Sequence, residues 1–319
     1  MTNSTMLCGK NALSSSISRL VNVLTLIFAF VISLFFSDEI AHSVKSGLSL
    51  AVNVVIPSIF PFIILSDALY SMLRFDSSSM IGRAFEWLFG ISRNAVYAFL
   101  LGAVCGFPLG VKCTSDLYHE GLISREEAER LIGFCNNTGP AFLISGVGMG
   151  LRKNASEGLA LYSAMLLSAV LVGIFFRKKA SVAIHFQSKR TGFSLTKSIR
   201  SAGMNTITVS SYLVFFACAV GLLRNILGES YLYLSILPFI EIGSAASILS
   251  KTKLLSSEAS LMLSGLAVGF SGLSVHLQAL SFISDSDIRT GKYFVMKTIQ
   301  GILSSLLVLP ISILFGNIY

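Results

Sequence analysis

Residues 102–140 constrain the fold more than any other part of this chain. The segment leaves an apolar run as GAVCGFPLGVK, crosses a charged stretch, and re-enters apolar sequence at FCNNTGP. Gly, Pro, Asn and Thr interrupt helices, and backbone freed by such a break is tolerated at bilayer depth only where it is buried in protein or lines a wet cavity. Two breaks that flank one charged loop predict a solute path built from discontinuous helices, as in secondary transporters.

The composition is that of a membrane protein. Of the 319 residues, 53% are hydrophobic and only 13% are charged, whereas soluble domains carry about 25% charged residues. The clearest span, residues 158–176, contains no charge and approaches the roughly 20 apolar residues that one crossing needs. We therefore expect an all-α polytopic membrane protein with a retained first helix. The other candidate spans are residues 20–36, 48–73, 95–111, 131–150, 204–227, 231–249, 261–282 and 294–315.

The net charge of +8 indicates membrane orientation rather than nucleic-acid binding. Seven Lys and Arg residues lie between positions 177 and 200, with no Asp or Glu among them. Such a cluster is typical of a cytoplasmic loop, and it lacks the interleaved aromatics or recognition motif of a nucleic-acid reader. The five cysteines show no paired spacing, so we expect buried free thiols and neither a metal site nor a cofactor.

The charge pattern predicts one re-entrant segment. With the N-terminus inside, complete crossings by residues 95–111, 131–150 and 158–176 would place the basic loop 177–200 outside, against the positive-inside rule. Residues 95–111, broken at GFPLG, are the best candidate for a hairpin that returns to its own side. Residues 56–62, IPSIFPF, are an alternative because two prolines could bend that helix back. Downstream, Ser124 and Glu127 have the spacing of a capping box that starts a helix.

Two internal similarities predict an inverted repeat. Residues 50–64 resemble residues 202–216, and residues 102–112 resemble residues 265–276. Together with the charge pattern, they predict an N-terminal membrane repeat (1–176), a basic cytoplasmic loop (177–200) and a C-terminal membrane repeat (201–319), the architecture of alternating access. Lys251 and Lys253 fit this scheme poorly, because they favour an inside loop.

The polar residues at the breaks are the candidate site, and no catalytic motif accompanies them, so we do not expect an enzyme. Lys112 could pair with an anionic solute or only reach the interface. Glu241, inside an apolar run, is the candidate for a coupling cation or proton, and Asp67 is a weaker ionisable candidate. The candidate substrate-binding residues are Gly106, Phe107, Pro108, Gly110, Lys112, Asn136, Asn137, Thr138, Gly139, Gly269, Ser271, Gly272, Ser274, His276 and Gln278.

Three of these stretches resemble the sporulation integral membrane proteins of the YlbJ/SpoVV type, which carry the nucleoside-recognition or Gate domain. The stretches are residues 56–62, 106–148 and 269–278, and the middle one is the most specific. The resemblance implies a fold like that of concentrative nucleoside transporters, with inverted repeats, re-entrant hairpins and broken transmembrane helices. The sequence departs from the family pattern at two places. Ser271 stands where the family's GFGG motif has its first of two final glycines, and the residues IGS follow Glu241 where a Thr-rich stretch is usual.

The resemblance also implies a function. The expected activity is transport of a small carboxylate, dipicolinic acid first, across the outer forespore membrane of a spore-former. Lys112, helix N-termini, amide donors and Phe107 would suit this planar dianion. The alternatives are a non-transporting membrane scaffold in spore formation and a Gate-type carrier of another small solute such as a nucleoside. The expected partners are the solute and the lipid bilayer, without nucleic acid, and a homo-oligomer remains open.

Overall fold

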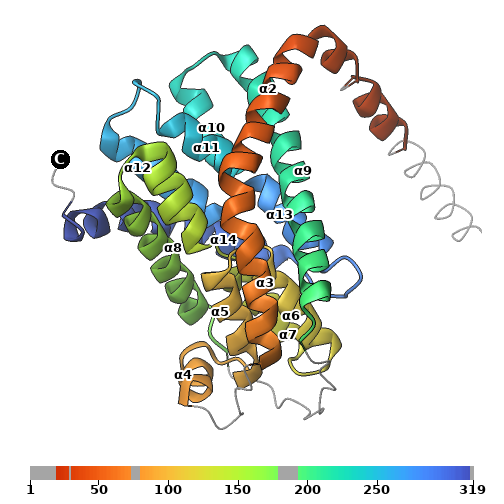
Figure 1. Ribbon diagram of the computed structural model, residues 1–319, viewed down its shortest axis with the longest axis vertical. Helices are drawn as coiled ribbons and strands as arrows, with labels where there is room; N and C mark the ends of the chain where they lie inside the picture. Colours follow the sequence, from red (N-terminus) through yellow and green to blue (C-terminus); the bar gives the residue numbers. More distant parts are fainter. Residues whose placement is uncertain (1–18, 29, 73–79, 179–192, 317–319) are drawn as a thin grey trace, which may run out of the picture.

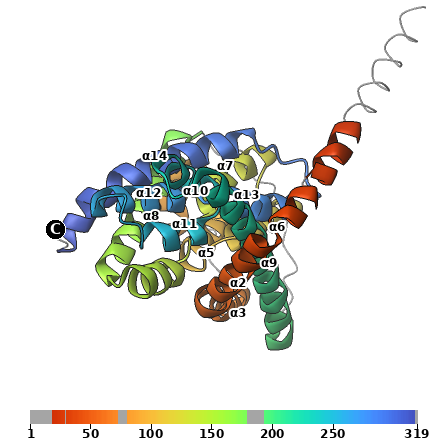
Figure 2. The ribbon, with the colours of Figure 1, turned by 90° about the horizontal axis from the view of Figure 1, so that it is seen from above.

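The computed structural model describes residues 19–28, 30–72, 80–178 and 193–316, and this part of the chain is helical without a β-strand (Figure 1). Five of its helices are long and apolar enough to cross a membrane: Ser37–Ala68, Ala155–Phe175, Leu195–Leu227, Ser257–Ser281 and Gly291–Leu314. The structure thus confirms the expectation of an all-α polytopic membrane protein. The apolar helix Arg19–Phe35 precedes them and extends away from the bundle (Figure 2).

Two long helices form one side of the molecule. The first continues from α2 (Ser37–Leu50) through a π-helical turn, η1 (Ala51–Val55), into α3 (Ile56–Met72). Although Pro61 lies inside α3, the chain does not turn back there, so residues 56–62 are not the re-entrant hairpin. Helix α9 (Leu195–Leu227) packs along α2 and α3 (Figures 1 and 2). A β-carbon on Gly47 would lie 3.1 Å from that of Ala217, which shows how close α2 and α9 come.

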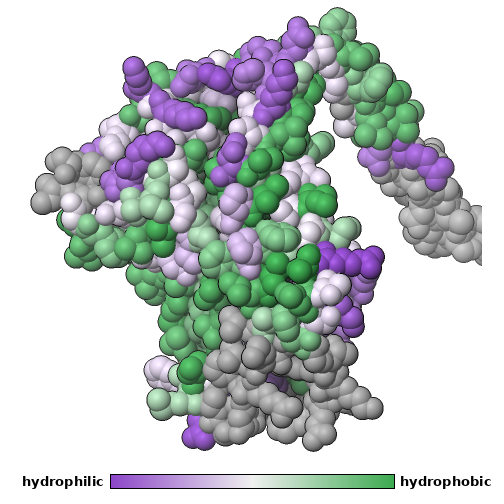
Figure 3. Space-filling model, viewed as in Figure 1, coloured by the Kyte–Doolittle hydropathy of each residue, from purple (hydrophilic) through white to green (hydrophobic). Residues whose placement is uncertain are grey.

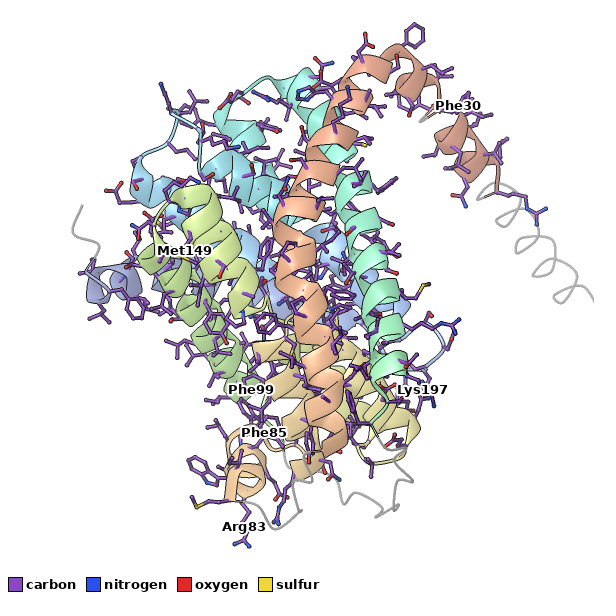
Figure 4. The ribbon with its side chains drawn as sticks, viewed as in Figure 1. Phe30, Arg83, Phe85, Phe99, Met149 and Lys197 are labelled. Carbon is purple, nitrogen blue, oxygen red and sulfur yellow. The ribbon has the colours of Figure 1, made fainter. Side chains whose placement is uncertain are left out.

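The first helical hairpin is made by α5 (Val96–Val104) and α6 (Leu109–His119), as predicted for residues 95–111. Its two arms touch at Gly102 and Gly110, and both glycines lie against the carbonyl group of Cys135. Helix α4 (Met80–Phe89) and the short helix η2 (Arg93–Ala95) lead into it, with a bend of 100° between Met80–Phe89 and Arg93–Val104. Phe85 and Phe99, with ring centroids 5.9 Å apart, hold α4 against the hairpin (Figure 4).

A broken span follows the first hairpin. Helix α7 (Arg125–Cys135) begins with the predicted capping box, in which the Ser124 side chain accepts the Glu127 N–H and the Glu127 side chain accepts the Ser124 N–H. Residues 136–139 are not helical, and the chain then continues as the π-helix η3 (Ala141–Arg152). A full crossing by α8 (Ala155–Phe175) ends this part of the molecule.

The C-terminal part repeats this order. Helices α10 (Tyr231–Ile240) and α11 (Ile242–Leu249) form a second hairpin, because the Thr252 hydroxyl after α11 donates to the Glu229 carboxylate before α10 (3.0 Å). The prediction of one span over residues 231–249 was therefore wrong, since the chain turns at Glu241. Helices α12 (Ser257–Phe270) and α13 (Gly272–Ser281) form the second broken span, and α14 (Gly291–Leu314) is the last crossing.

The order of long helix, hairpin, broken span and single span thus occurs twice, as the inverted-repeat fold requires. One detail of the sequence comparison was wrong. Gly106 is the tip of a hairpin, whereas Gly269 lies inside a broken span, so the structural counterpart of Gly106 is Glu241. The second hairpin also places Lys251, which lines one cavity with Glu229, at the opposite end of α9 from the basic loop. Lys251 and Lys253 therefore do not lie on the side of the basic loop, although their charge alone favoured an inside position.

The surface supports a membrane location. Hydrophobic residues cover much of the side formed by α2, α3 and α9, while hydrophilic residues gather near the upper end and at one lower edge (Figure 3). Arg83 of α4 and Lys197 of α9 both lie toward the lower end of the molecule (Figure 4). Helices α6 and α7 are joined to the segment before α14 through Asp287, which accepts the Tyr118 hydroxyl (2.6 Å) and pairs with Arg125 (3.0 Å). Both contacts lower the pKa of Asp287.

Candidate functional site

The tip of the first hairpin packs on the first helix break. Gly106 has a positive φ of 86°, which favours glycine. A β-carbon there would lie 2.6 Å from the backbone nitrogen of Gly139, and one on Gly139 would lie 3.1 Å from the Cys105 carbonyl oxygen. Tip and break are therefore in direct backbone contact. The predicted residues Gly106 and Gly139 make a close approach of two irregular segments rather than supply side-chain chemistry.

The first break is held by a fully buried polar network that centres on Lys297 of α14. The Lys297 ammonium donates to the Asn136 carbonyl oxygen and to Gln300 Oε1, both at 2.8 Å. The Gln300 amide donates in turn to Asn137 Oδ1 (2.8 Å) and to the Met165 carbonyl oxygen (3.3 Å). Lys297, Gln300, Asn136 and Asn137 are all 0% exposed. The network thus satisfies backbone and side-chain groups that the break would leave unpaired.

A second set of contacts joins this network to the other broken span. The Tyr293 hydroxyl lies 3.1 Å from Asn136 Nδ2 and 2.7 Å from His276 Nδ1. The predicted residue His276 therefore faces α14, and its ring also makes edge contacts with Phe270 and Phe294. Tyr293, not His276, makes the contact with the first repeat, and His276 packs within the second repeat rather than lining the cavity described below.

The tip of the second hairpin packs on the second break in the same way. Gly272 has a φ of 68°, and a β-carbon there would lie 3.1 Å from the Ile240 carbonyl oxygen and 3.2 Å from the Glu241 nitrogen. Glu241 is 2% exposed and caps α11, because its carboxylate accepts the N–H groups of Gly243 (2.8 Å) and Ser244. Its negative charge therefore lies at the positive end of a helix.

A narrow cavity lies between the two tips. Phe107 of the first hairpin lines it together with Glu241, Ser274 and Gln278 of the second repeat, and apolar residues of α3, α9 and η3 close it. The volume is about 20 Å³, which holds a water molecule but not an organic solute. Gln278 Oε1 is buried without a hydrogen-bond partner. Phe107 also lines a smaller adjoining cavity with Thr138, whose hydroxyl oxygen is likewise buried and unpartnered.

The structure brings together most of the predicted site residues, but not Lys112. Lys112 lines a separate cavity with Asp67 and Asp116, and residues 136–139 of the break are not among those that line it. Pro108 is buried at the start of α6, and Gly110 packs against Cys135. Gly269 allows α12 to approach α14, since a β-carbon there would lie 2.7 Å from the Gln300 carbonyl oxygen.

Sequence reasoning missed Lys297 and Gln300. Both lie in the predicted span of residues 294–315, where a lysine three residues inside an otherwise apolar run was a detectable signal. Its closeness in sequence to the charged residues Arg289 and Lys292 made it resemble an interfacial lysine. Only the packing of α14 against α7 and α8 shows that the side chain reaches the break.

The fold and the site define a class of protein. A solved structure, that of CNTnw in an inward-facing substrate-bound state, superposes on 97% of this chain and 86% of its own, with a TM-score of 0.50 and 14% sequence identity. At that identity the likeness is one of fold, and it confirms the expected architecture of a concentrative nucleoside transporter. The protein is a multi-pass integral membrane protein with a transporter-like fold.

A curated relative places the chain more narrowly. The sporulation integral membrane protein YlbJ of Bacillus subtilis (strain 168) is 27% identical to it over 310 residues, which cover 83% of this chain and 76% of the relative. This match confirms the resemblance seen in the sequence and supports membership in the YlbJ family. No protein-family model matches the chain.

Proposed function

We propose that the protein is a transporter that moves a small polar solute through the space between its two hairpin tips. The observation that carries the proposal is the cavity itself, where Phe107, Glu241 and Gln278 from opposite repeats meet beside two helix breaks. Backbone freed at bilayer depth is tolerated where it is buried in protein or lines a path, and both breaks lie beside this cavity. Alternating access would move the two tips relative to α3 and α9, because the closed cavity is too small for a solute.

The first candidate solute is a small carboxylate, with dipicolinic acid as the favoured member. Helices α6 and α13 both begin beside the cavity, and neither start has a side-chain cap. Free N–H groups at helix starts favour an anion, and the Phe107 ring offers a face for a planar aromatic solute. In this proposal the protein works in the outer forespore membrane and releases the solute chemically unchanged. Net flux against a gradient would need a coupled cation or proton, whereas downhill flux would need only the gradient of the solute itself.

A nucleoside-like solute is the second candidate. The Glu241 carboxylate and the free Gln278 Oε1 line the same cavity, and both are acceptors for hydroxyl or amine donors. The fold likeness to a concentrative nucleoside transporter is compatible with this choice but shows the fold alone. A carboxylate dianion would meet repulsion from Glu241, whereas a neutral nucleoside would not, so the two solutes make opposite demands on this residue.

Uptake into proteoliposomes tests the proposal. Purified protein would be given labelled dipicolinate or labelled uridine, with Gln278→Leu and Phe107→Leu as cavity variants. Ser284→Ala, on an exposed loop, is the control. We expect dipicolinate uptake by the wild type and the control, with at least tenfold loss in the cavity variants. Uridine uptake alone would select the second candidate.

Failure of both solutes in folded protein would favour the non-transporting scaffold. Lys112→Ala distinguishes between two possible solute sites, because Lys112 lines a cavity other than the one between the tips. If the solute binds between the tips, this variant keeps most of its uptake. Loss of uptake in Lys112→Ala with normal uptake in Gln278→Leu would move the site to the cavity of Asp67 and Asp116.

A further inference from the structure

The amine of Lys297 is buried where both of its hydrogen-bond acceptors are oxygen atoms. Its side chain is 0% exposed, and both of its hydrogen bonds go to neutral acceptors, the Asn136 carbonyl oxygen and Gln300 Oε1. Among the ion pairs of the described residues, none involves Lys297. A buried charge without a counter-charge destabilises the folded state. An apolar residue would therefore serve better if this position were needed for packing alone.

The acceptors have the character of a cation site. Asn136 directly follows α7, so its carbonyl oxygen lies at the negative end of a helix dipole. The orientation of Gln300 is fixed by its own donors, which bind Asn137 Oδ1 and the Met165 carbonyl oxygen, and this turns Oε1 toward Lys297. Unwound carbonyls and C-terminal ends of half-helices are the groups that coordinate coupling cations in transporters with broken helices.

In the part of the chain that the structure describes, no carboxylate forms an ion pair or hydrogen bond with Lys297. The neighbouring ionisable groups are Cys135 of α7, Tyr293 of α14 and His276 of α13, which are a thiol, a phenol and an imidazole. Glu241, which the sequence suggested as the coupling-ion residue, instead caps α11 with both carboxylate oxygens. Groups of three or more His, Cys, Asp or Glu side chains that could hold a metal ion do not occur in the described part of the chain.

We propose that the Lys297 ammonium is a built-in cation, which occupies the position of an exchangeable alkali ion at the first break. The inference deepens the proposed function, because it states that the transport cycle requires neither Na⁺ nor K⁺. Lys297 is a positioning residue: it holds the Asn136–Thr138 segment in its unwound form through the Asn136 carbonyl and Gln300. Because the Lys297 ammonium is part of the chain and cannot dissociate, the stability of this break should not depend on the salt that is present.

Thermal unfolding of the purified full-length protein tests the inference without any transport measurement. The wild type would be compared in NaCl, KCl and choline chloride at equal ionic strength. We expect the same Tm in all three, because no small cation binds. A Tm that rises selectively and saturably with Na⁺ or K⁺ would overturn the proposal, since binding to the folded state alone stabilises it by mass action.

Two substitutions sharpen the test. Lys297→Ala removes the charge and leaves space, so we expect a lower Tm in choline chloride and a selective rise of several degrees with Na⁺, K⁺ or methylammonium. Lys297→Met removes the charge but fills the space, so small cations should not rescue it. Equal behaviour of the Ala and Met variants in all salts would contradict the proposal. Should Lys297→Ala fail to accumulate, the wild-type comparison still decides.

The proposed transport function fails separately. If the Tm of the wild type does not depend on the cation and no solute is taken up, the result supports the built-in cation and contradicts only the proposed transport function. Uptake that depends on an imposed Na⁺ or K⁺ gradient would do the reverse, since it would confirm transport and reject the built-in cation.

Discussion

The two repeats of this protein stabilise their irregular segments with side chains of opposite type, a lysine in the first repeat and a glutamate in the second. In each repeat, a tip packs on a helix break through a glycine with positive φ, Gly106 in the first repeat and Gly272 in the second. At the first break, the unpaired Asn136 carbonyl oxygen at the negative end of α7 is bound by Lys297, which belongs to another helix, α14. At the second tip, the free N–H groups at the positive start of α11 are bound by Glu241, which belongs to the tip itself. The comparison teaches that the repeat conserves backbone geometry while the polar side chains that stabilise it differ.

The largest expected effect comes from Gly106→Ala at the first tip. The substitution meets both an unfavourable φ and the Gly139 nitrogen at 2.6 Å, so we expect a loss of about 3 kcal/mol or more of stability. The measurement is the yield of folded protein and its thermal unfolding in detergent. Gly203→Ala is the matched control, because a β-carbon there meets no atom within 4 Å. A normal Tm in Gly106→Ala would show that the tip does not pack on the break.

Two glutamines should separate stability from transport. Gln300→Leu leaves Asn137 and Lys297 short of partners, and we expect it to cost about 2–3 kcal/mol. Gln278→Leu removes an oxygen that has no partner, so we expect little change in Tm together with loss of uptake. Thermal unfolding and uptake of both variants make the comparison. Equal destabilisation by the two substitutions would remove the distinction between a structural network and a solute cavity.

At the second tip, Glu241→Gln should act as the loss of a helix cap. The amide retains one acceptor oxygen where the carboxylate now binds the N–H groups of Gly243 and Ser244. We expect a loss of about 1–2 kcal/mol, the usual value for an N-cap, and less than for Gln300→Leu. Unfolding in detergent provides the measurement, with Ser235→Ala, on the exposed side of α10, as a control. A larger loss than in Gln300→Leu would mean that Glu241 carries more than the cap.

The smallest effect, and the only stabilising one, is expected for Ser271→Gly. Ser271 has a φ of 82°, which disfavours a side chain, and its hydroxyl makes only a long bond of 3.4 Å to the Val268 carbonyl oxygen. After subtraction of the chain entropy that glycine adds to the unfolded state, we expect a gain of about 0.5–1 kcal/mol. The Tm should rise slightly, and a fall would show that the serine has a role at the second break.

Sequence reasoning located the tip of the first hairpin and the first break, but not the groups that hold them. The GFPLG and NNTGP motifs predicted where the helices end, and the charge pattern predicted that residues 95–111 form a hairpin, because both signals are local or additive along the chain. The second hairpin was mistaken for a span, since α10 and α11 together are long and apolar and a single Glu241 does not reveal a turn. Thr252 and Glu229 close that hairpin from 23 positions apart, which no local pattern records.

The sequence by itself determined the class of the protein, because hydropathy, charge placement and helix-breaking residues act through the bilayer and the backbone alone. Only the tertiary structure decided which polar residues meet. Lys112 and Lys297 are both lysines next to apolar segments, yet one lies beside Asp67 and the other reaches the first break. The difference depends on how α14 packs across α7 and α8, and packing between helices far apart in the chain sets burial and hydrogen bonding that neither residue's neighbours specify.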